Sequence, residues 1–153
     1  MHSHFPLNKL SVVAFVACGI FVALEVVTAQ APPAPPHSVS DGVYTQDQAK
    51  RGEDAYVQKC ARCHGTDLHS GDAAPPLVGT DFLSNWNQKN MGDLFERVRT
   101  TMPSDKPGSL NRQQVSDILS YILSENKFPA GKDELGTQAD ALKQIQIDAY
   151  KQQ

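Results

Sequence analysis

The segment Cys60-Ala61-Arg62-Cys63-His64 constrains this chain more than any other feature, because Cys-x-x-Cys-His is the attachment signature of c-type haem. In a helical turn, Cys60 and Cys63 lie on one face and His64 continues that face. Two thioether bonds can then hold the porphyrin edge while the imidazole of His64 reaches the iron. The motif therefore predicts one covalently attached haem c whose iron is bound by His64.

A zinc site and a redox dithiol are the alternative interpretations of the two cysteines. A zinc site needs a second pair of ligands, and the histidines beyond the extreme N-terminus, His37 and His69, lack metal-pair spacing. A thioredoxin-like dithiol needs alternating strands and helices, which the hydrophobic periodicity does not indicate. Haem attachment is the preferred interpretation.

Residues 1–29 have the pattern of a secretory signal peptide. Lys9 precedes a mostly apolar run over residues 10–27, and the run ends in the small-residue pattern of a cleavage site at Ala29. One acidic residue interrupts the run and proline-rich sequence follows it, so cleavage is preferred to an uncleaved anchor. We expect a periplasmic protein that contacts the membrane only if this segment is retained.

The remaining sequence suits one small domain. Residues 30–44 are rich in proline and predict an extended tether, residues 45–131 predict the haem domain, and residues 132–153 predict a partly helical C-terminal extension. A domain this small buries limited apolar surface, so the haem is expected to complete its core. The formal net charge is −3 with no basic run suited to a phosphate backbone, so nucleic acid is not expected as a partner.

The hydrophobic periodicity past the tether is helical, and no segment alternates long enough to predict a strand. We therefore predict an all-α fold of about four to five short helices around the haem. The helices are expected to begin at or near Thr45, Asn90, Asn111 and Thr137, where Thr45 and Asn111 have capping-box spacing to a glutamine. The positions expected to face inward are Ala49, Gly52 and Tyr56, then Met91, Leu94, Phe95 and Val98, then Val115, Ile118, Leu119 and Ile122, and finally Leu142 and Ile145.

The second axial ligand of the iron separates an electron carrier from a haem that binds external ligands. Met102 is the preferred candidate because it lies between a predicted helix and Pro103, on a loop where its thioether can point inward. Met91 falls on the apolar stripe of a helix and is expected in the core. His69 is close to His64 in sequence and would have to loop around the haem edge. The expected metal ligands are His64 and Met102, with Met91, His69 and an open position as alternatives.

The order of these features resembles the monohaem class I cytochromes c of bacteria over roughly residues 45–131. The resemblance is carried by Tyr56, the Cys-x-x-Cys-His-Gly segment at 60–65, Pro75-Pro76-Leu77-Val78-Gly79, Met102-Pro103 and Tyr121-Ile122-Leu123. It implies the cytochrome c fold, with the cofactor bound by Cys60, Cys63, His64 and Met102.

The same resemblance implies roles for further residues. The first and last main helices are expected to cross at Gly52 and Tyr56, opposite Ile118 and either Tyr121 or Ile122. The carbonyl of Pro75 is expected to accept a hydrogen bond from the second ring nitrogen of His64, which would fix the ring and raise its basicity; an ordinary turn is the alternative. Leu77 would pack on the haem, and Trp86 would lie near a propionate or serve as a packed hydrophobe.

The function implied is that of a periplasmic one-electron carrier, not an enzyme, between a dehydrogenase and a respiratory acceptor. Residues 126–131 and the sequence after them look like cytochromes associated with quinoprotein alcohol dehydrogenases, so such an enzyme and a terminal oxidase are the expected redox partners. The alternatives are a five-coordinate haem sensor, a peroxidase-like haem enzyme, and a cytochrome subunit of a dehydrogenase complex. A possible docking surface for an acidic partner, with scattered solvated charge as its alternative, comprises Lys59, Arg62, Arg97, Arg99 and Lys106.

Overall fold

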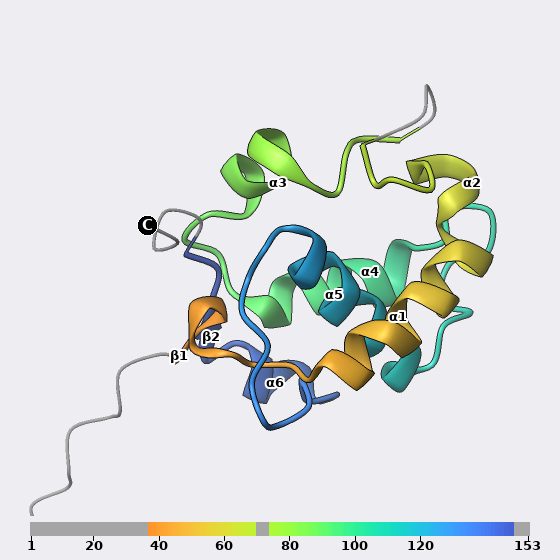
Figure 1. Ribbon diagram of the computed structural model, residues 1–153. Coiled ribbons are helices and arrows are strands. Elements are labelled where there is room, and N and C mark those ends of the chain that lie inside the picture. The colour runs from red at the N-terminus through yellow and green to blue at the C-terminus, as the bar shows by residue number, and fades with distance from the viewer. Residues whose placement is uncertain (1–36, 70–73, 149–153) are drawn as a thin grey trace, which may run out of the picture. The chain divides into compact units, whose positions relative to one another are not determined.

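A computed structural model describes residues 37–69 and 74–148 of the chain (Figure 1). The elements within these ranges are β1 (His37–Ser38), the 3-10 turn η1 (Val39–Asp41), α1 (Gln46–Lys59), α2 (Ala61–His64), α3 (Gly79–Trp86), α4 (Met91–Thr101), α5 (Arg112–Glu125), α6 (Ala139–Leu142) and β2 (Ile145–Gln146). This architecture confirms the predicted all-α class. The predicted signal peptide lies outside the described residues, and none of the helices described here is long and apolar enough to cross a bilayer.

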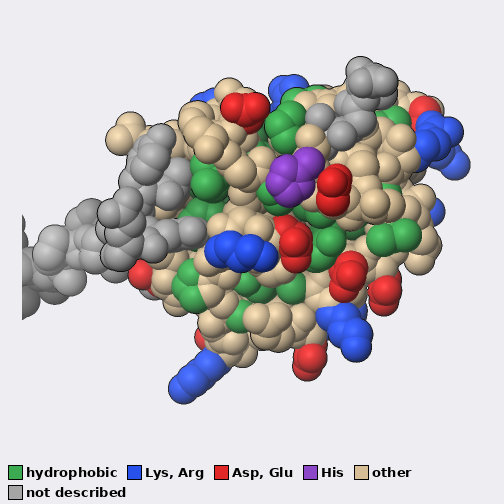
Figure 2. All heavy atoms as spheres, turned by 45° about the horizontal axis from the view of Figure 1, so that its top comes forward, with side chains coloured by type: hydrophobic (Ala, Val, Ile, Leu, Met, Phe, Trp, Pro, Cys, Tyr) green, Lys and Arg blue, Asp and Glu red, His purple; other side chains and the backbone are tan. Residues whose placement is uncertain are grey.

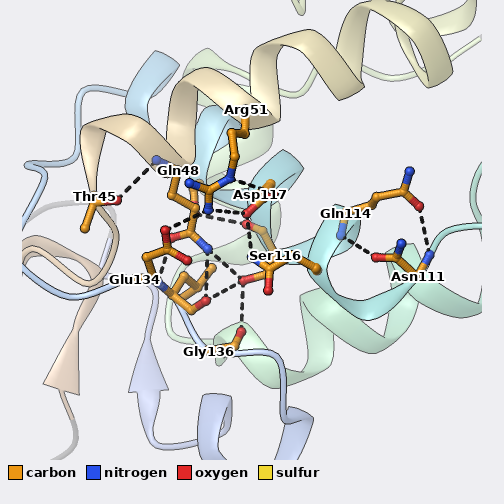
Figure 3. Close-up of polar contacts among 12 residues, drawn as sticks. Thr45, Gln48, Arg51, Asn111, Gln114, Ser116, Asp117, Glu134 and Gly136 are labelled. Carbon is orange, nitrogen blue, oxygen red and sulfur yellow. Dashed lines mark hydrogen bonds and ion pairs between the residues drawn. The ribbon is translucent and has the colours of Figure 1, made fainter.

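The three main helices begin where capping residues predicted. Thr45 Oγ1 accepts a hydrogen bond from the Gln48 N–H at 3.1 Å, and Asn90 caps α4 in the same way. At α5 the capping box is complete, because Asn111 and Gln114 each accept from the other's backbone N–H, at 3.0 and 2.9 Å (Figure 3). At α1 the box is only half formed, since the Gln48 side chain is buried and bonded elsewhere.

Helices α1 and α5 cross with their backbones in contact, as predicted (Figure 1). A Cβ atom on Gly52 would lie 1.9 Å from the carbonyl oxygen of Asp117, so only glycine permits this approach. One turn further along α1, the Tyr56 and Tyr121 rings pack with centroids 5.4 Å apart in a tilted arrangement. The crossing places the C-terminal end of α1, and with it the haem-attachment motif, at a fixed position against α5.

The predicted inward faces of α4 and α5 are buried, apart from Val98, which is partly buried. Helix α5 is buried over more of its surface than a one-sided amphipathic helix, since Ser116, Ser120 and Leu123 are buried as well. Helix α1 and helix α4 both pack on it, and Leu135 contacts Ser116 from a further side. A helix surrounded in this way forms the centre of the domain.

The expected tether differs from the structure at its C-terminal end. Ser38, Val39 and Tyr44 are buried, and the Tyr44 hydroxyl donates a 2.6 Å hydrogen bond to the carbonyl oxygen of Phe128. The average composition of residues 30–44 does not distinguish Val39 and Tyr44, which bury apolar surface that a solvated tether would expose. The domain therefore begins before residue 45.

Residues 132–148, which we call the tail, pack on the domain. Their buried residues include Leu135, Leu142 and Ile147. The predicted tail helix is a single turn, α6, and Ile145 is only partly buried, because it belongs to β2, which pairs in parallel with β1 (Figure 1). The sequence did not predict β1 and β2, because a strand of two residues is too short to show an alternation of apolar and polar side chains.

The tail is held to the α1–α5 crossing by polar side chains (Figure 3). The Leu135 N–H donates to Gln48 Oε1 at 2.7 Å, and Gln48 Nε2 donates to the Leu135 carbonyl at 3.0 Å. The Ser116 hydroxyl lies 2.6 Å from the same carbonyl. Next to this cluster, Arg51 bridges Asp117 of α5 and Glu134 of the tail.

Candidate haem site

The described residues line a cavity of about 820 Å³ that is partly open to solvent. Its walls come from the end of α1, from α2 to α5, from residues 74–77 and from the loop 102–110. The four predicted site residues all line it: Cys60, Cys63, His64 and Met102. The structure thus brings together side chains that are separated in sequence by two helices.

The attachment motif is a single helical turn that continues α1. Cys60 ends α1, where its N–H donates to the Tyr56 carbonyl at 2.8 Å, and the N–H groups of Cys63 and His64 both donate to the Cys60 carbonyl. Burial, and secondarily the nearby Cys63, raises the pKa of the Cys60 thiol to about 11. Before a haem is attached, the Cys60 thiol is therefore protonated at neutral pH, and this part of the cavity wall is uncharged.

His64 is held in one orientation and one tautomer. Its ring is nearly buried, and Nδ1 lies 2.9 Å from the carbonyl oxygen of Pro75, which is the contact that the family resemblance implied. A carbonyl can only accept, so Nδ1 carries the proton and Nε2 keeps the lone pair that a metal needs. The Tyr56 hydroxyl donates to the carbonyl of Gly65 at 2.7 Å, which ties the end of this turn back to α1.

Of the candidates for the second axial ligand, only Met102 lines the cavity. It is the C-cap of α4, with its N–H bonded to the Val98 carbonyl at 3.0 Å and an extended backbone that leaves the helix. Met91 is fully buried in the core and is absent from the cavity wall. The His69 side chain is 71% exposed and its Nδ1 lies 2.8 Å from the Asp67 carbonyl, also away from the cavity.

Most of the remaining wall is apolar. Leu77 lines the cavity, as the resemblance implied, and Trp86 does so with the Lys89 ammonium 5.2 Å from its ring centre. Sequence analysis did not assign these further wall residues to the site: Phe82, Leu94, Val98, Leu110, Ile118 and Ile122. Helix α3 was not predicted, although Phe82 and Trp86, four residues apart, were a usable signal.

The cavity fits a haem better than the other interpretations of the motif. Protein interiors hold few voids larger than a water molecule, whereas cofactor sites occupy roughly 300–1,000 Å³. The observed volume lies in that range, with two thiols and an imidazole lone pair on one wall and a thioether on another. Over residues 37–69 and 74–148, no three His, Cys, Asp or Glu side chains converge as a zinc site would require.

Comparison with known families gives the same result. The family model described as "Cytochrome C oxidase, cbb3-type, subunit III" matches residues 47–122, which span α1 to α5 and include every predicted haem ligand. The chain contains a cytochrome c domain. Such a domain carries covalently bound haem c with its iron, so the predicted fold class and cofactor are both confirmed.

The chain is similar to one curated protein and to one solved structure. The thiosulfate dehydrogenase of Stutzerimonas stutzeri (strain A1501) is 30% identical over 86 residues, which are 50% of this chain and 27% of that protein. The chain therefore spans little more than a quarter of that relative's length. The crystal structure of the sulfane dehydrogenase SoxCD from Paracoccus pantotrophus is 18% identical, with a TM-score of 0.45, and the match covers 78% of this chain and 68% of that chain.

Basic side chains surround the cavity, but some are already paired. The cavity-lining cations are Lys59, Arg62, Lys89, Arg97 and Lys106. Arg62 pairs with Asp105 at 2.6 Å. Arg99, which was also predicted here, does not line the cavity and pairs with Glu96 at 2.6 Å, and this hydrogen bond lowers the pKa of the Glu96 carboxyl. Acidic and basic side chains alternate on the face drawn in Figure 2, so no single sign of charge covers it.

Proposed function

We propose that this domain is a periplasmic one-electron carrier whose iron is bound by His64 and Met102. The observation that carries the proposal is that both side chains line one cavity, one from the Cys-x-x-Cys-His turn and one from the end of α4. Histidine and methionine together are the axial pair of cytochromes that cycle between two oxidation states. The signal-peptide pattern over residues 1–29 supports the compartment.

Each part of the cavity has a distinct role in this function. A haem held here supplies a one-electron Fe(III)/Fe(II) couple. Cys60 and Cys63 would hold its edge through thioether bonds, and the Pro75 carbonyl fixes the His64 ring and raises the basicity of Nε2. The apolar wall excludes water and so disfavours the extra charge of the ferric state. A positive reduction potential is the expected result.

A sensor or peroxidase with an open iron position is less well supported. Peroxidase chemistry needs a distal acid–base group. The hydroxyls of Thr100 and Thr101, which precede Met102, donate to backbone carbonyls of α4 at 2.6 and 2.7 Å. Both hydroxyls are therefore already bonded within α4, and Met102 lines the cavity next to them.

A cytochrome subunit of a dehydrogenase is the second candidate function. The relative named thiosulfate dehydrogenase supports it, because the matched 86 residues are a part of a longer protein. The same relative supports a dehydrogenase as the electron donor if the chain acts as a separate carrier. The resemblance of residues 126–131 supports a quinoprotein alcohol dehydrogenase as that donor and a terminal oxidase as the acceptor.

The ligand assignment is tested with a matched pair of methionine variants of the holoprotein. Met102→Ala should lose the weak long-wavelength band of Met–iron coordination in the ferric spectrum and bind carbon monoxide when reduced. Met91→Ala should keep the wild-type spectrum and lose about 2–5 kcal/mol of stability, because it empties a fully buried core position. A change of axial ligation in Met91→Ala, or an unchanged spectrum in Met102→Ala, would refute the assignment.

A further inference from the structure

Residues 86–90, which connect α3 to α4, form one wall of the cavity, and we call them the wall loop. Trp86 and Lys89 both line the cavity, and the Lys89 ammonium lies over the Trp86 ring. Gln88 has a φ of +63°, in the left-handed region that a non-glycine residue rarely adopts. A loop with this backbone conformation needs contacts from outside to hold it in place.

Those contacts come from the end of the tail. The Ile147 N–H donates to the Lys89 carbonyl at 2.8 Å, and the Gln88 N–H donates to the Ile147 carbonyl at 2.9 Å. Asn90 and Gln146 form an antiparallel bridge beside them. The Ile147 side chain is completely buried, so these hydrogen bonds lie next to the core rather than in solvent.

The tail is itself anchored at points outside the wall loop. Gln48 and Ser116 hold Leu135 at the α1–α5 crossing. Helix α6 lies directly against α4 at Gly92, where a Cβ atom would be 2.5 Å from the Ala139 carbonyl oxygen. Strand β2 pairs with β1 on its other edge. The segment that holds the wall loop is therefore fixed independently of the cavity.

We propose that the tail is a brace that fixes the Trp86–Lys89 wall of the haem cavity and keeps water away from the cofactor. Ile147 is a positioning residue in this arrangement, because it acts through the wall loop and does not line the cavity. A wall loop that is free to move admits water beside the haem. Water stabilises the more highly charged ferric state, so the reduction potential falls. The inference rests on the proposed function only in requiring a haem in this cavity.

The test compares two substitutions of Ile147 in the full-length holoprotein. Ile147→Pro removes the N–H that donates to Lys89, whereas Ile147→Ala keeps it and loses the buried side chain. Both variants should unfold at lower urea concentration. Only Ile147→Pro should also lower the reduction potential and increase the exchange rate of the Gln88 amide by about twofold or more through local opening.

Equal potentials and equal exchange rates of the Gln88 amide in the two variants would overturn the proposal and leave the tail with a packing role alone. If Ile147→Pro does not fold, hydrogen exchange of the unmodified holoprotein decides the question. The amides of Gln88 and Ile147 should then exchange slowly and at a common rate, and exchange of either at the rate of an exposed loop amide would refute the proposal. Neither measurement needs a redox partner, so failure of the carrier function would be seen separately, in the Met102 spectra.

Discussion

Replacing Gln48 by leucine should destabilise the protein although it puts an apolar side chain into a buried site. The Gln48 amide is fully buried and makes two hydrogen bonds to the backbone of Leu135, at 2.7 and 3.0 Å. In Gln48→Leu the Leu135 carbonyl keeps the Ser116 hydroxyl at 2.6 Å, but the Leu135 N–H loses the acceptor that Gln48 provides. The larger part of the effect therefore comes from one buried donor.

The magnitude follows from the cost of an unpaired group. A buried N–H without an acceptor costs about 1–3 kcal/mol, and the lost Nε2 bond adds about 0.5–1.5 kcal/mol. Burial of the new leucine offsets part of this sum, by about 1 kcal/mol or somewhat more. The net loss in the free energy of unfolding should be about 1–3 kcal/mol, which corresponds to a fall in Tm of about 4 °C or more for a domain of this size.

Urea unfolding of the holoprotein, followed by far-ultraviolet circular dichroism, measures this loss. The matched control is Gln46→Leu, which makes the same chemical change at an exposed position of the same helix and should stay within about 0.5 kcal/mol of wild type. The slope of free energy against urea should be the same in all three proteins. If Gln48→Leu unfolds at the same urea concentration as Gln46→Leu, the tail is not held by this amide.

Three further predictions concern pH, charge and maturation. Burial raises the phenol pKa of Tyr44 and of Tyr121, so as the pH rises the unfolded chain loses these protons before the folded protein does. The free energy of unfolding should therefore keep its full value below about pH 10 and fall above it, less steeply in Tyr44→Phe. Urea midpoints measured over a pH series would show this. Electron exchange with an acidic partner should slow as salt rises. It should slow more in Arg97→Gln than in Arg99→Gln, because Arg97 lines the cavity and Arg99 does not. Stopped-flow rates over a salt series that do not change in Arg97→Gln would exclude this docking surface. The intact mass of periplasmic material should correspond to a chain starting at Gln30 with one haem, and haem released by acidic organic solvent would contradict covalent attachment.

Much of this fold follows from short-range sequence signals. The N-caps Thr45, Asn90 and Asn111 mark the starts of the three main helices because each satisfies a backbone N–H that the helix itself leaves free. The haem-attachment turn was equally predictable from the sequence, since the Cys-x-x-Cys-His motif needs only local geometry. The Glu96–Arg99 pair is also predictable from the sequence, because residues three apart lie on one helix face.

The tail could not be predicted in the same way. Its position depends on Gln48, a residue type that is usually exposed, and on backbone groups of Leu135 that have no sequence signature. Helix α3 is short, and its two cavity-facing aromatic residues do not build a long periodic pattern. These elements owe their structure to tertiary contacts, which single-sequence propensities do not contain.

The α1–α5 crossing also has a consequence for the order of events as the protein folds. Arg51 and Asp117, which meet at the crossing, are 66 residues apart in sequence, so the chain must close a long loop before it gains these contacts. Cys60 lies at the end of α1, and Ile118 and Ile122 of α5 line the cavity. A porphyrin attached at Cys60 would therefore offer α5 a large apolar surface on which to pack. Haem attachment should for this reason favour closure of the long loop between the two helices.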